Sequence, residues 1–158
     1  MADAISIKFD ANGVNAALDG LTAGAMKNVR PAAQAGAQVL YDEVRANVAK
    51  IGKKTGNLAR SIYQAYSEDN STKGSATYHV SYNASKAPHG NLVEYGHIQT
   101  RKVYLGRDGN WYTSKTLLPE PKQVGARPYI RPAFDAKSKR AVEAARDAFV
   151  DGMKQVTG

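Results

Sequence analysis

Apolar and polar residues alternate at the start of the chain. Within residues 4–10 the apolar positions are Ile5, Ile7 and Phe9, and the intervening polar ones are Ser6 and Lys8. Successive side chains of a β-strand point to opposite faces, so this alternation predicts a half-buried strand. Three glycines come next, at Gly13, Gly20 and Gly24. Because a glycine inside a helix costs about 1 kcal/mol relative to alanine, we expect only short helical pieces in this region.

From Val29 to Ile51 the apolar residues recur three and four positions apart. The members of this stripe are Ala33, Ala37, Leu40, Val44 and Val48. One face of an α-helix repeats every 3.6 residues, so the spacing predicts the longest helix of the chain. Gly36 lies within it and, with the alanines beside it, offers a surface of small residues that another element can approach closely. Gly52 is predicted to end the helix before a basic turn.

Strand patterns return after the long helix. The segments Ile62 to Tyr66 and Ser75 to Ala84 are rich in strand-forming residues, and we expect them to pair as a hairpin. The polar segment Glu68 to Gly74 between them is predicted to be an exposed, mobile loop. Tyr78 and Tyr82 fall on the apolar side of the second strand, which favours a place in the core or in a subunit interface over stacking on nucleic-acid bases.

Residues 98–125 show little core pattern. Val103 to Leu105 and Trp111 to Tyr112 flank Asp108-Gly109, a dipeptide typical of two-residue hairpin turns. This arrangement predicts a protruding β-arm. Long segments with few core residues are commonly functional, so we expect the arm to contact a neighbouring subunit. The candidate contact residues are Arg101, Tyr104, Arg107, Trp111 and Tyr112.

A second helix is predicted at the end of the chain, where Pro132 suits a first helical turn. Its apolar residues are Phe134, Val142, Ala145, Phe149 and Met153. Together the elements predict an α+β fold, with a small antiparallel sheet packed against the long helix and the C-terminal helix and with the hairpin arm protruding from it. The 158 residues suit one compact domain, so we expect residues 1–158 to form a single domain.

The composition narrows the class of protein. Hydrophobic residues make up 42% and charged residues 23% of the chain, values typical of globular proteins. The absence of cysteine excludes disulfides and thiolate sites, and folding in a reducing cytoplasm is expected. No apolar run approaches the roughly 20 residues that cross a bilayer, and charged residues interrupt the N-terminus. We therefore expect a soluble protein without a secretion signal.

The net charge of +8 is unevenly distributed. One stretch without a carboxylate contains Arg45, Lys50, Lys53, Lys54 and Arg60. Such a cluster fits a polyanionic neighbour such as duplex DNA. It equally fits a solvated face that keeps the protein dispersed, and the sequence leaves both interpretations open.

The sequence offers weak candidates for catalysis. His89, Glu94 and His97 are types of residue that bind zinc, but their spacing differs from the helical metalloprotease motif. No hydroxyl lies in a nucleophile elbow, and the segment from Gly52 to Gly56 lacks the spacing of a phosphate-binding loop. Thr55 or Asn57 is better explained as a helix cap. We therefore expect neither an enzyme nor a bound metal or cofactor.

Three segments together resemble a known family, the tail-component proteins of lambda-like bacteriophages, described as head-tail joining, neck, tail-completion or tail-terminator proteins. The first contains Thr55, Gly56, Leu58 and Ser61, similar to the family's Lys-Thr-Gly-x-Leu-x-x-Ser-Ile. The second contains Pro88, His89, Val93, Glu94, Tyr95 and Gly96, similar to Ala-Pro-His-x-x-Leu-Val-Glu-aromatic-Gly. The third contains Arg127, Pro128, Arg131 and Pro132, similar to Arg-Pro-aromatic-aliphatic-Arg-Pro-Ala. The likeness spans roughly Val29 to Phe149, and His97 departs from the family's usual small hydroxyl residue.

The resemblance implies a structural virion protein that forms a ring, sixfold in keeping with a phage tail, where head and tail meet. Its partners would be further copies of itself, the head-side connector and the tail-tube protein, with a possible passing contact with duplex DNA and no membrane. Assembly would take place in the host cytoplasm. The alternatives are a nucleic-acid-binding module that uses the basic stretch and, least favoured, a metal-dependent enzyme.

The motif residues also allow a physical interpretation without catalysis. Leu92 and Val93 can anchor a short turn to the core, and Gly96 can adopt the backbone angles that end it. Glu94 would then be free to pair with a basic residue, either Arg127 or Arg131, which Pro128 and Pro132 hold in place. The alternative is that all three charged side chains are solvated.

Overall fold

The computed structural model describes residues 12–52, 56–109 and 111–157. Its elements are α1 (Asn12–Ile51), α2 (Asn57–Ser61), β1 (Ile62–Thr72), β2 (Ser75–Tyr82), α3 (Gly90–Tyr95), β3 (His97–Leu105), β4 (Trp111–Val124) and α4 (Arg131–Thr157). The predicted α+β class is confirmed. The strand predicted for residues 4–10 lies outside the described residues.

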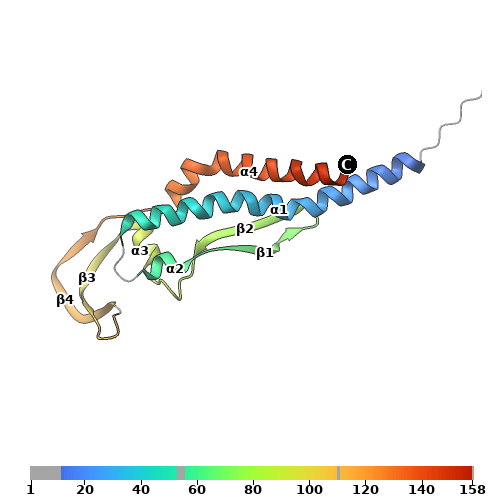
Figure 1. The fold of residues 1–158 in the computed structure, drawn as a ribbon. Helices are drawn as coiled ribbons and strands as arrows, with labels where there is room; N and C mark the ends of the chain where they lie inside the picture. The colour runs from blue at the N-terminus through green and yellow to red at the C-terminus, as the bar shows by residue number, and fades with distance from the viewer. Residues whose placement is uncertain (1–11, 53–55, 110, 158) are drawn as a thin grey trace, which may run out of the picture.

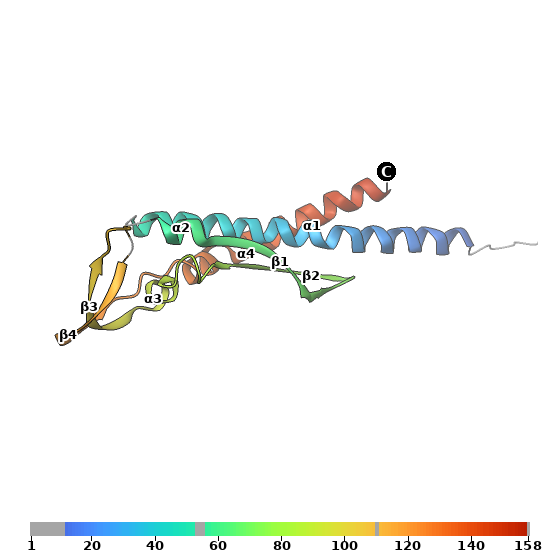
Figure 2. The same cartoon turned by 90° about the horizontal axis from the view of Figure 1, so that it is seen from below.

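Helix α1 is the central layer of the molecule. Helix α4 lies along one side of it, and the hairpin of β1 and β2 lies along the opposite side (Figure 1). Strands β3 and β4 form a second hairpin, which projects beyond the end of α1 (Figure 2). The described strands therefore form two separate two-stranded antiparallel sheets, one on the body and one in the arm.

Helix α1 is much longer than predicted. It begins at Asn12 and includes Pro31 and the three glycines, Gly13, Gly20 and Gly24, that had been expected to limit helix formation. The expectation of a helix-poor region was wrong, and at Gly24 the packing of α4 supplies a physical reason, whereas a Cβ on Gly20 would meet nothing within 4 Å. A Cβ on Gly24 would lie 2.6 Å from Val156, and one on Gly36 would lie 2.8 Å from the carbonyl oxygen of Ala141. Glycine therefore allows the two helices to approach, and their packing offsets its low helix propensity.

The apolar core is concentrated at the arm end of the molecule. Its buried members are Val44, Val48, Leu58, Ile62, Ala87, Tyr129 and Ala133. They come from α1, α2, the start of β1, the turn before α3, the segment before α4 and the start of α4, so segments far apart in the sequence meet here. As predicted, α1 ends at Ile51, and Gly52 follows in a left-handed conformation with φ of 94°.

Helix α4 faces α1 with small residues. Ala133 and Ala141 are buried against α1, whereas Phe134 is 60% exposed and Val142 is 70% exposed. Phe134 and Val142, which the sequence pattern grouped with the apolar residues of this helix, therefore lie outside its contact with α1. Since the two helices touch through glycine and alanine, the space between them is too narrow for these larger side chains.

The hairpin of β1 and β2 is confirmed, with Ile62 opposite Tyr82 and Ser67 opposite Thr77. Strand β1 is longer than predicted, because most of the expected loop continues the strand as far as Thr72 and the turn consists of Lys73 and Gly74. The register shifts between Ser67 and Thr72. There Ser71 Oγ donates to the Ser67 carbonyl and accepts from the Thr77 amide.

The predicted arm is also a hairpin. Strand β3 pairs antiparallel with β4 from His97 opposite Val124 to Leu105 opposite Trp111. Strand β3 ends at Leu105 and β4 begins at Trp111, so the strands are further apart along the chain than a two-residue turn would place them, and the Gly109 amide donates to the Gly106 carbonyl at 3.0 Å. Register shifts on both sides of Arg101 add residues to β4, including Pro119 and Pro121. Prolines lack the amide that a regular ladder needs, so they fit this irregular part.

Candidate functional site at the root of the arm

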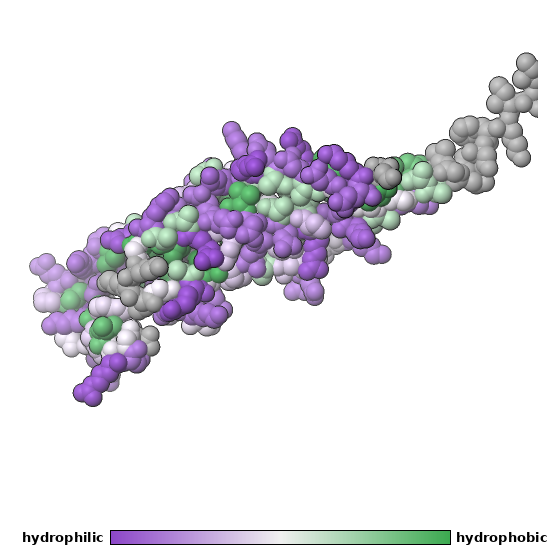
Figure 3. Space-filling view, viewed as in Figure 1, coloured by the Kyte–Doolittle hydropathy of each residue, from purple (hydrophilic) through white to green (hydrophobic). Residues whose placement is uncertain are grey.

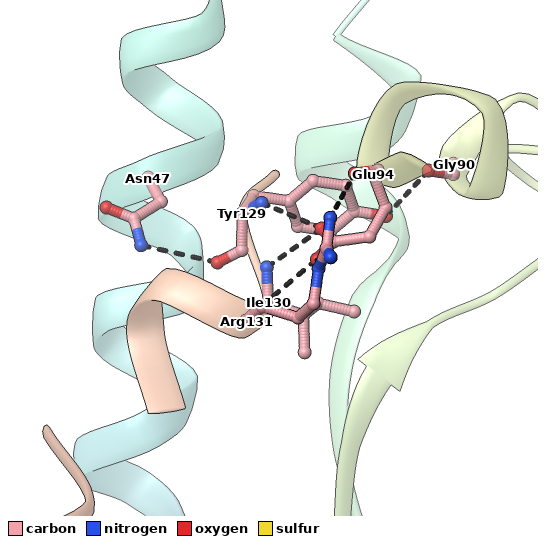
Figure 4. A network of polar contacts seen from close by, with 6 residues as sticks. All are labelled: Asn47, Gly90, Glu94, Tyr129, Ile130 and Arg131. Carbon is pink, nitrogen blue, oxygen red and sulfur yellow. Dashed lines mark hydrogen bonds and ion pairs between the residues drawn. The ribbon is translucent and has the colours of Figure 1, made fainter. Parts of the chain in front are cut away.

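The carboxylate of Glu94 lies at the centre of a polar network (Figure 4). Glu94 belongs to the short helix α3, and only 3% of it is exposed. Its Oε2 accepts from the amides of Tyr129 at 2.7 Å and Ile130 at 3.0 Å. Its Oε1 accepts from the amide of Arg131 at 3.1 Å and from the Arg131 Nε at 3.2 Å. Four donors from one segment thus converge on one carboxylate.

These bonds place a negative charge at the start of α4. The first amides of a helix have no partner within the helix, and the helix dipole is positive at this end. The Glu94 carboxylate, from a distant segment, gives these amides an acceptor and places a negative charge at the positive end of the dipole. Burial by itself raises the pKa of Glu94, but the amides of Tyr129, Ile130 and Arg131 and the Arg131 side chain outweigh it and hold that pKa below its ordinary value of 4.5. Glu94 therefore stays ionised in the folded protein at neutral pH.

Tyr129 is the side chain around which the segments pack, and it is 0% exposed. Its hydroxyl donates to the Gly90 carbonyl at 3.3 Å, and its own carbonyl accepts from Asn47 Nδ2 at 3.3 Å (Figure 4). The ring meets that of Tyr82 edge-on, with centroids 6.3 Å apart. Burial, with the nearby Tyr82 and Glu94, raises the pKa of Tyr129 well above its ordinary value, so it stays protonated.

Arg131, and not Arg127, is the basic partner of Glu94. The Arg131 Nη2 also donates to the Glu94 carbonyl at 3.1 Å, and the guanidinium carbon lies 4.7 Å from the centre of the Tyr95 ring. Arg127 contributes its backbone instead, since its amide donates to the Val93 carbonyl at 2.8 Å. Arg131 therefore ties the start of α4 to α3 through its side chain and amide, and Arg127 ties the segment before α4 to α3 through its main chain.

Gly96 lies at the root of the arm, between the end of α3 and the start of β3. As predicted, it ends α3, with φ of 74° and ψ of 173°. A Cβ there would lie 2.7 Å from the Val124 carbonyl oxygen and 2.8 Å from the Ala126 amide nitrogen. Strand β3 starts at the next residue, and β4 ends at Val124. The two strands of the arm thus leave the body side by side from one tightly packed point, which we call the clamp: Glu94, Gly96, Tyr129 and Arg131.

The first sequence motif packs in the same core as Tyr129 of the clamp. Leu58 packs in the core beside Tyr129, and the buried Ser61 Oγ donates to the Leu58 carbonyl at 2.7 Å. Gly56 precedes α2 with φ of 74°. Thr55 or Asn57 was expected to cap this helix, but the N-cap position is Gly56, and the Oδ1 of Asn57 accepts from Arg60 Nη2 at 2.6 Å. Thr55 lies outside the described residues.

Some residues of the second motif pack against the core, and others are exposed to solvent. Val93 packs against the core, but Leu92 is exposed, so the prediction that both anchor the turn was wrong for Leu92. Pro88 and His89 are exposed, and the His89 carbonyl accepts from the Val93 amide at 3.0 Å. Pro128 and Pro132 line a shallow pocket with Arg131 on the surface over the start of α4.

The geometry offers no catalytic arrangement at these residues. Both oxygens of Glu94 accept hydrogen bonds from Tyr129, Ile130 and Arg131, and in residues 12–52, 56–109 and 111–157 no three His, Asp or Glu side chains lie together as metal ligands would. The buried Nδ1 of His97 has no hydrogen-bond partner within the part of the chain that the structure describes. None of the helices described there combines the length and the apolar character that a membrane span requires.

The basic stretch is only partly described, because Lys53 and Lys54 lie outside the described residues. Arg45 Nη1 donates to the Tyr41 hydroxyl at 3.4 Å, and Lys50 Nζ donates to Asn47 Oδ1 at 3.3 Å. Lys50 and Arg127 line one shallow pocket beside the clamp. Arg45, Lys50 and Arg60 are all exposed, as both interpretations of the stretch require.

The arm is exposed along most of its length, and Figure 3 shows hydrophobic side chains on it among hydrophilic ones. All five predicted contact residues, Arg101, Tyr104, Arg107, Trp111 and Tyr112, are exposed. The rings of Tyr104 and Tyr112 lie 5.9 Å apart, and Arg101 Nη1 donates to the Lys115 carbonyl at 2.9 Å.

Two residues of the site were not singled out from the sequence. Asn47 carries no motif signal, because its role depends on the carbonyl of a residue 82 positions away. Tyr129 stands between two prolines in the third motif, and an aromatic residue held between rigid positions is a signal that could have identified it as a core anchor.

The comparisons with known proteins agree with the resemblance seen in the sequence. Residues 13–96, just over half of the chain, match the family described as "HK97-gp10_like: Bacteriophage HK97-gp10, putative tail-component". The matched region runs from α1 to Gly96, so the arm, α4 and the third motif lie beyond it. No curated protein and no solved structure matches the chain.

Proposed function

The chain belongs to the HK97-gp10-like family of bacteriophage tail components, and from this premise we propose that it forms a ring at the junction of head and tail. A tail component has a structural role in the virion. The specific proposal is that identical copies meet around the tail axis, sixfold, as a neck, tail-completion or tail-terminator ring. The head-side connector and the tail-tube protein would be its axial partners.

The exposed arm is the observation that carries this proposal. Large apolar side chains cover it, including Val103, Leu105 and Leu117, which is 62% exposed. A two-stranded hairpin is marginally stable in water by itself. Exposed apolar surface of this kind marks a site of protein association. An arm that is fixed at its root and uncovered along its length is suited to contact another subunit.

A ring also requires two different surfaces on each subunit. A head-to-tail contact repeated around an axis closes when the rotation fits. The arm is at one end of the elongated molecule, and the body extends away from it along α1 (Figures 1 and 2). A subunit of this shape presents the arm to one neighbour and its body to the other. We propose that the whole chain acts as one such unit, assembled in the host cytoplasm, and that its role is geometric and not enzymatic.

Deletion of residues 107–112 tests the proposal. The arm tip contributes nothing to the core, so the variant should fold, with the circular dichroism of the full chain, and form no rings in electron micrographs. A matched control is Phe134→Ser/Val142→Ser, which removes exposed apolar side chains from α4 and should leave rings intact. Rings formed by the deletion variant, or absence of the protein from mature particles, would refute the proposal.

Passing contact with duplex DNA is the second candidate function. The observation in its favour is that Lys50, from the basic stretch, lines the same pocket as Arg127. If phosphates are the ligand, the affinity for duplex should fall by about 0.9 log units per log unit of salt for each contact. Binding that is undetectable at low salt would eliminate this candidate without affecting the ring.

A further inference from the structure

Both faces of the arm carry large apolar side chains. Residues directly opposite one another in an antiparallel pair share a face, and successive residues alternate. Val103 and Leu105, with their partners Thr113 and Trp111, therefore lie on one face, and Tyr104 and Tyr112 lie on the other. No other described element packs extensively against either strand. A partner that covers the arm would bury apolar surface that is now in water.

The outer face of the regularly paired part of the body sheet, residues 62–67 with residues 77–82, carries no Asp, Glu, Lys or Arg. In this part the residues that face away from α1 are Tyr63, Ala65, Ser67, Thr77, His79 and Ser81. The alternate residues pack on α1, where Val80 and Tyr82 join the core. Solvated protein surfaces have roughly a quarter to a third charged residues. Because the core of a protein interface is depleted of charged residues, this uncharged face is suited to contact another chain.

The charges beside these two surfaces are complementary. In the arm, Arg101, Lys102, Arg107, Lys115 and Lys122 outnumber the acidic Asp108 and Glu120. At the far end of the body hairpin, Glu68 and Asp69 are exposed, and neither forms an ion pair with another described residue. Opposite charges flanking two apolar or neutral surfaces favour one orientation of docking.

The arm cannot reach this face of its own chain. In Figures 1 and 2 the arm extends beyond the C-terminal end of α1, whereas the hairpin of β1 and β2 runs back along α1 in the other direction. We infer that the arm of one copy packs on the outer face of β1 and β2 of a second copy, with its basic residues near Glu68 and Asp69. This inference rests on the proposed ring and specifies the contact that closes it.

Cross-linking tests the contact, because the chain has no cysteine of its own. The double variant Ala65→Cys/Val103→Cys carries one thiol on each proposed surface. A short bismaleimide should convert its assemblies into a ladder of covalent multimers, since every contact joins one thiol of each kind. The single variants should give no ladder. The control Val103→Cys/Val142→Cys, with its second thiol on the outer side of α4, should also give none.

The outcomes separate the inference from the proposed function. Full-sized assemblies in which the double variant yields no ladder, or in which the α4 control yields one, would overturn the docking site and leave the ring standing. A chain that sediments as a monomer at every concentration would overturn both. A ladder from Ala65→Cys/Val103→Cys alone supports both.

Charge reversal gives an independent readout. Glu68→Lys/Asp69→Lys places like charges opposite the arm and should weaken self-association by about tenfold or more, measured by sedimentation equilibrium. The matched control Glu143→Lys/Asp147→Lys reverses two exposed carboxylates on α4 and should leave the association constant unchanged. Equal effects of both double variants would show that net charge, and not this contact, governs association, and would overturn the proposed orientation.

Discussion

The clamp and the arm are neighbours in the chain, but the clamp buries and hydrogen-bonds its side chains, whereas the arm exposes them. In the clamp, Glu94 is buried and every bond it needs is made within the chain. In the arm, which starts one residue after Gly96, apolar and aromatic side chains are exposed on both faces. The clamp is complete in one copy, whereas in the proposed ring the arm is covered by a partner. Stability should therefore depend on the first region and assembly on the second.

The largest expected effect on stability comes from Glu94→Ala. The substitution leaves three amides at the start of α4 and the Arg131 guanidinium without their acceptor. A buried amide left without an acceptor costs about 1–3 kcal/mol, and because three amides lose theirs we expect a loss of about 3 kcal/mol or more in the free energy of unfolding measured with urea. Glu143→Ala is the control, because its exposed pair with Arg140 contributes at most about 1 kcal/mol. Equal losses in the two variants would contradict the central role of the clamp.

Gly96→Ala should have the next largest effect. With φ of 74° and ψ of 173°, Gly96 occupies a region almost exclusive to glycine, where another residue costs about 1–3 kcal/mol, and the added methyl group would collide with the main chain at Val124 and Ala126. We expect a loss of about 2 kcal/mol, again by urea unfolding, because strain at the root adds to the conformational cost. Gly74→Ala is the matched control, since a Cβ there meets nothing within 4 Å. A neutral Gly96→Ala variant would show that the root is not tightly packed.

Acid should weaken the clamp. The folded-state pKa of Glu94 lies below its ordinary value of 4.5, so its contribution is complete above pH 4.5 and is lost as the pH falls toward the folded-state pKa. The loss amounts to about 1.4 kcal/mol for each unit by which that pKa is lowered. Glu94→Gln cannot ionise, so its stability should fall less steeply between pH 4.5 and 3. Parallel pH profiles of the two proteins would contradict this assignment.

The smallest effect is expected from the arm. Val103→Ser/Leu105→Ser changes side chains that are already in water, so the free energy of unfolding should change by no more than about 0.5 kcal/mol. Thermal unfolding followed by circular dichroism measures this. A loss of several kcal/mol would mean that the arm is part of the fold and would remove the contrast between the two regions.

The sequence predicts the elements better than their contacts. The alternation in β2 and the weak core pattern of residues 98–125 were sufficient for the body hairpin and the arm. Helix α1 was predicted too short because the glycines before Val29 were judged by local propensity, whereas at Gly24 the packing of α4 offsets that propensity. The same packing turns Phe134 outward, and no local pattern contains that information.

The candidate site was predicted in part. A carboxylate followed two residues later by a glycine indicated a turn with a charged partner, and the choice between Arg127 and Arg131 stayed open. The structure adds three backbone amides and the buried ring of Tyr129. These depend on two segments about 35 residues apart meeting in space, which spacing along one chain does not specify.

Sedimentation equilibrium of the wild-type chain beside Val103→Ser/Leu105→Ser and Val142→Ser tests the division between clamp and arm most directly. We expect the wild type and Val142→Ser to form oligomers of the same mass, and the arm variant to sediment as a folded monomer. An arm variant that assembles like the wild type would contradict the account.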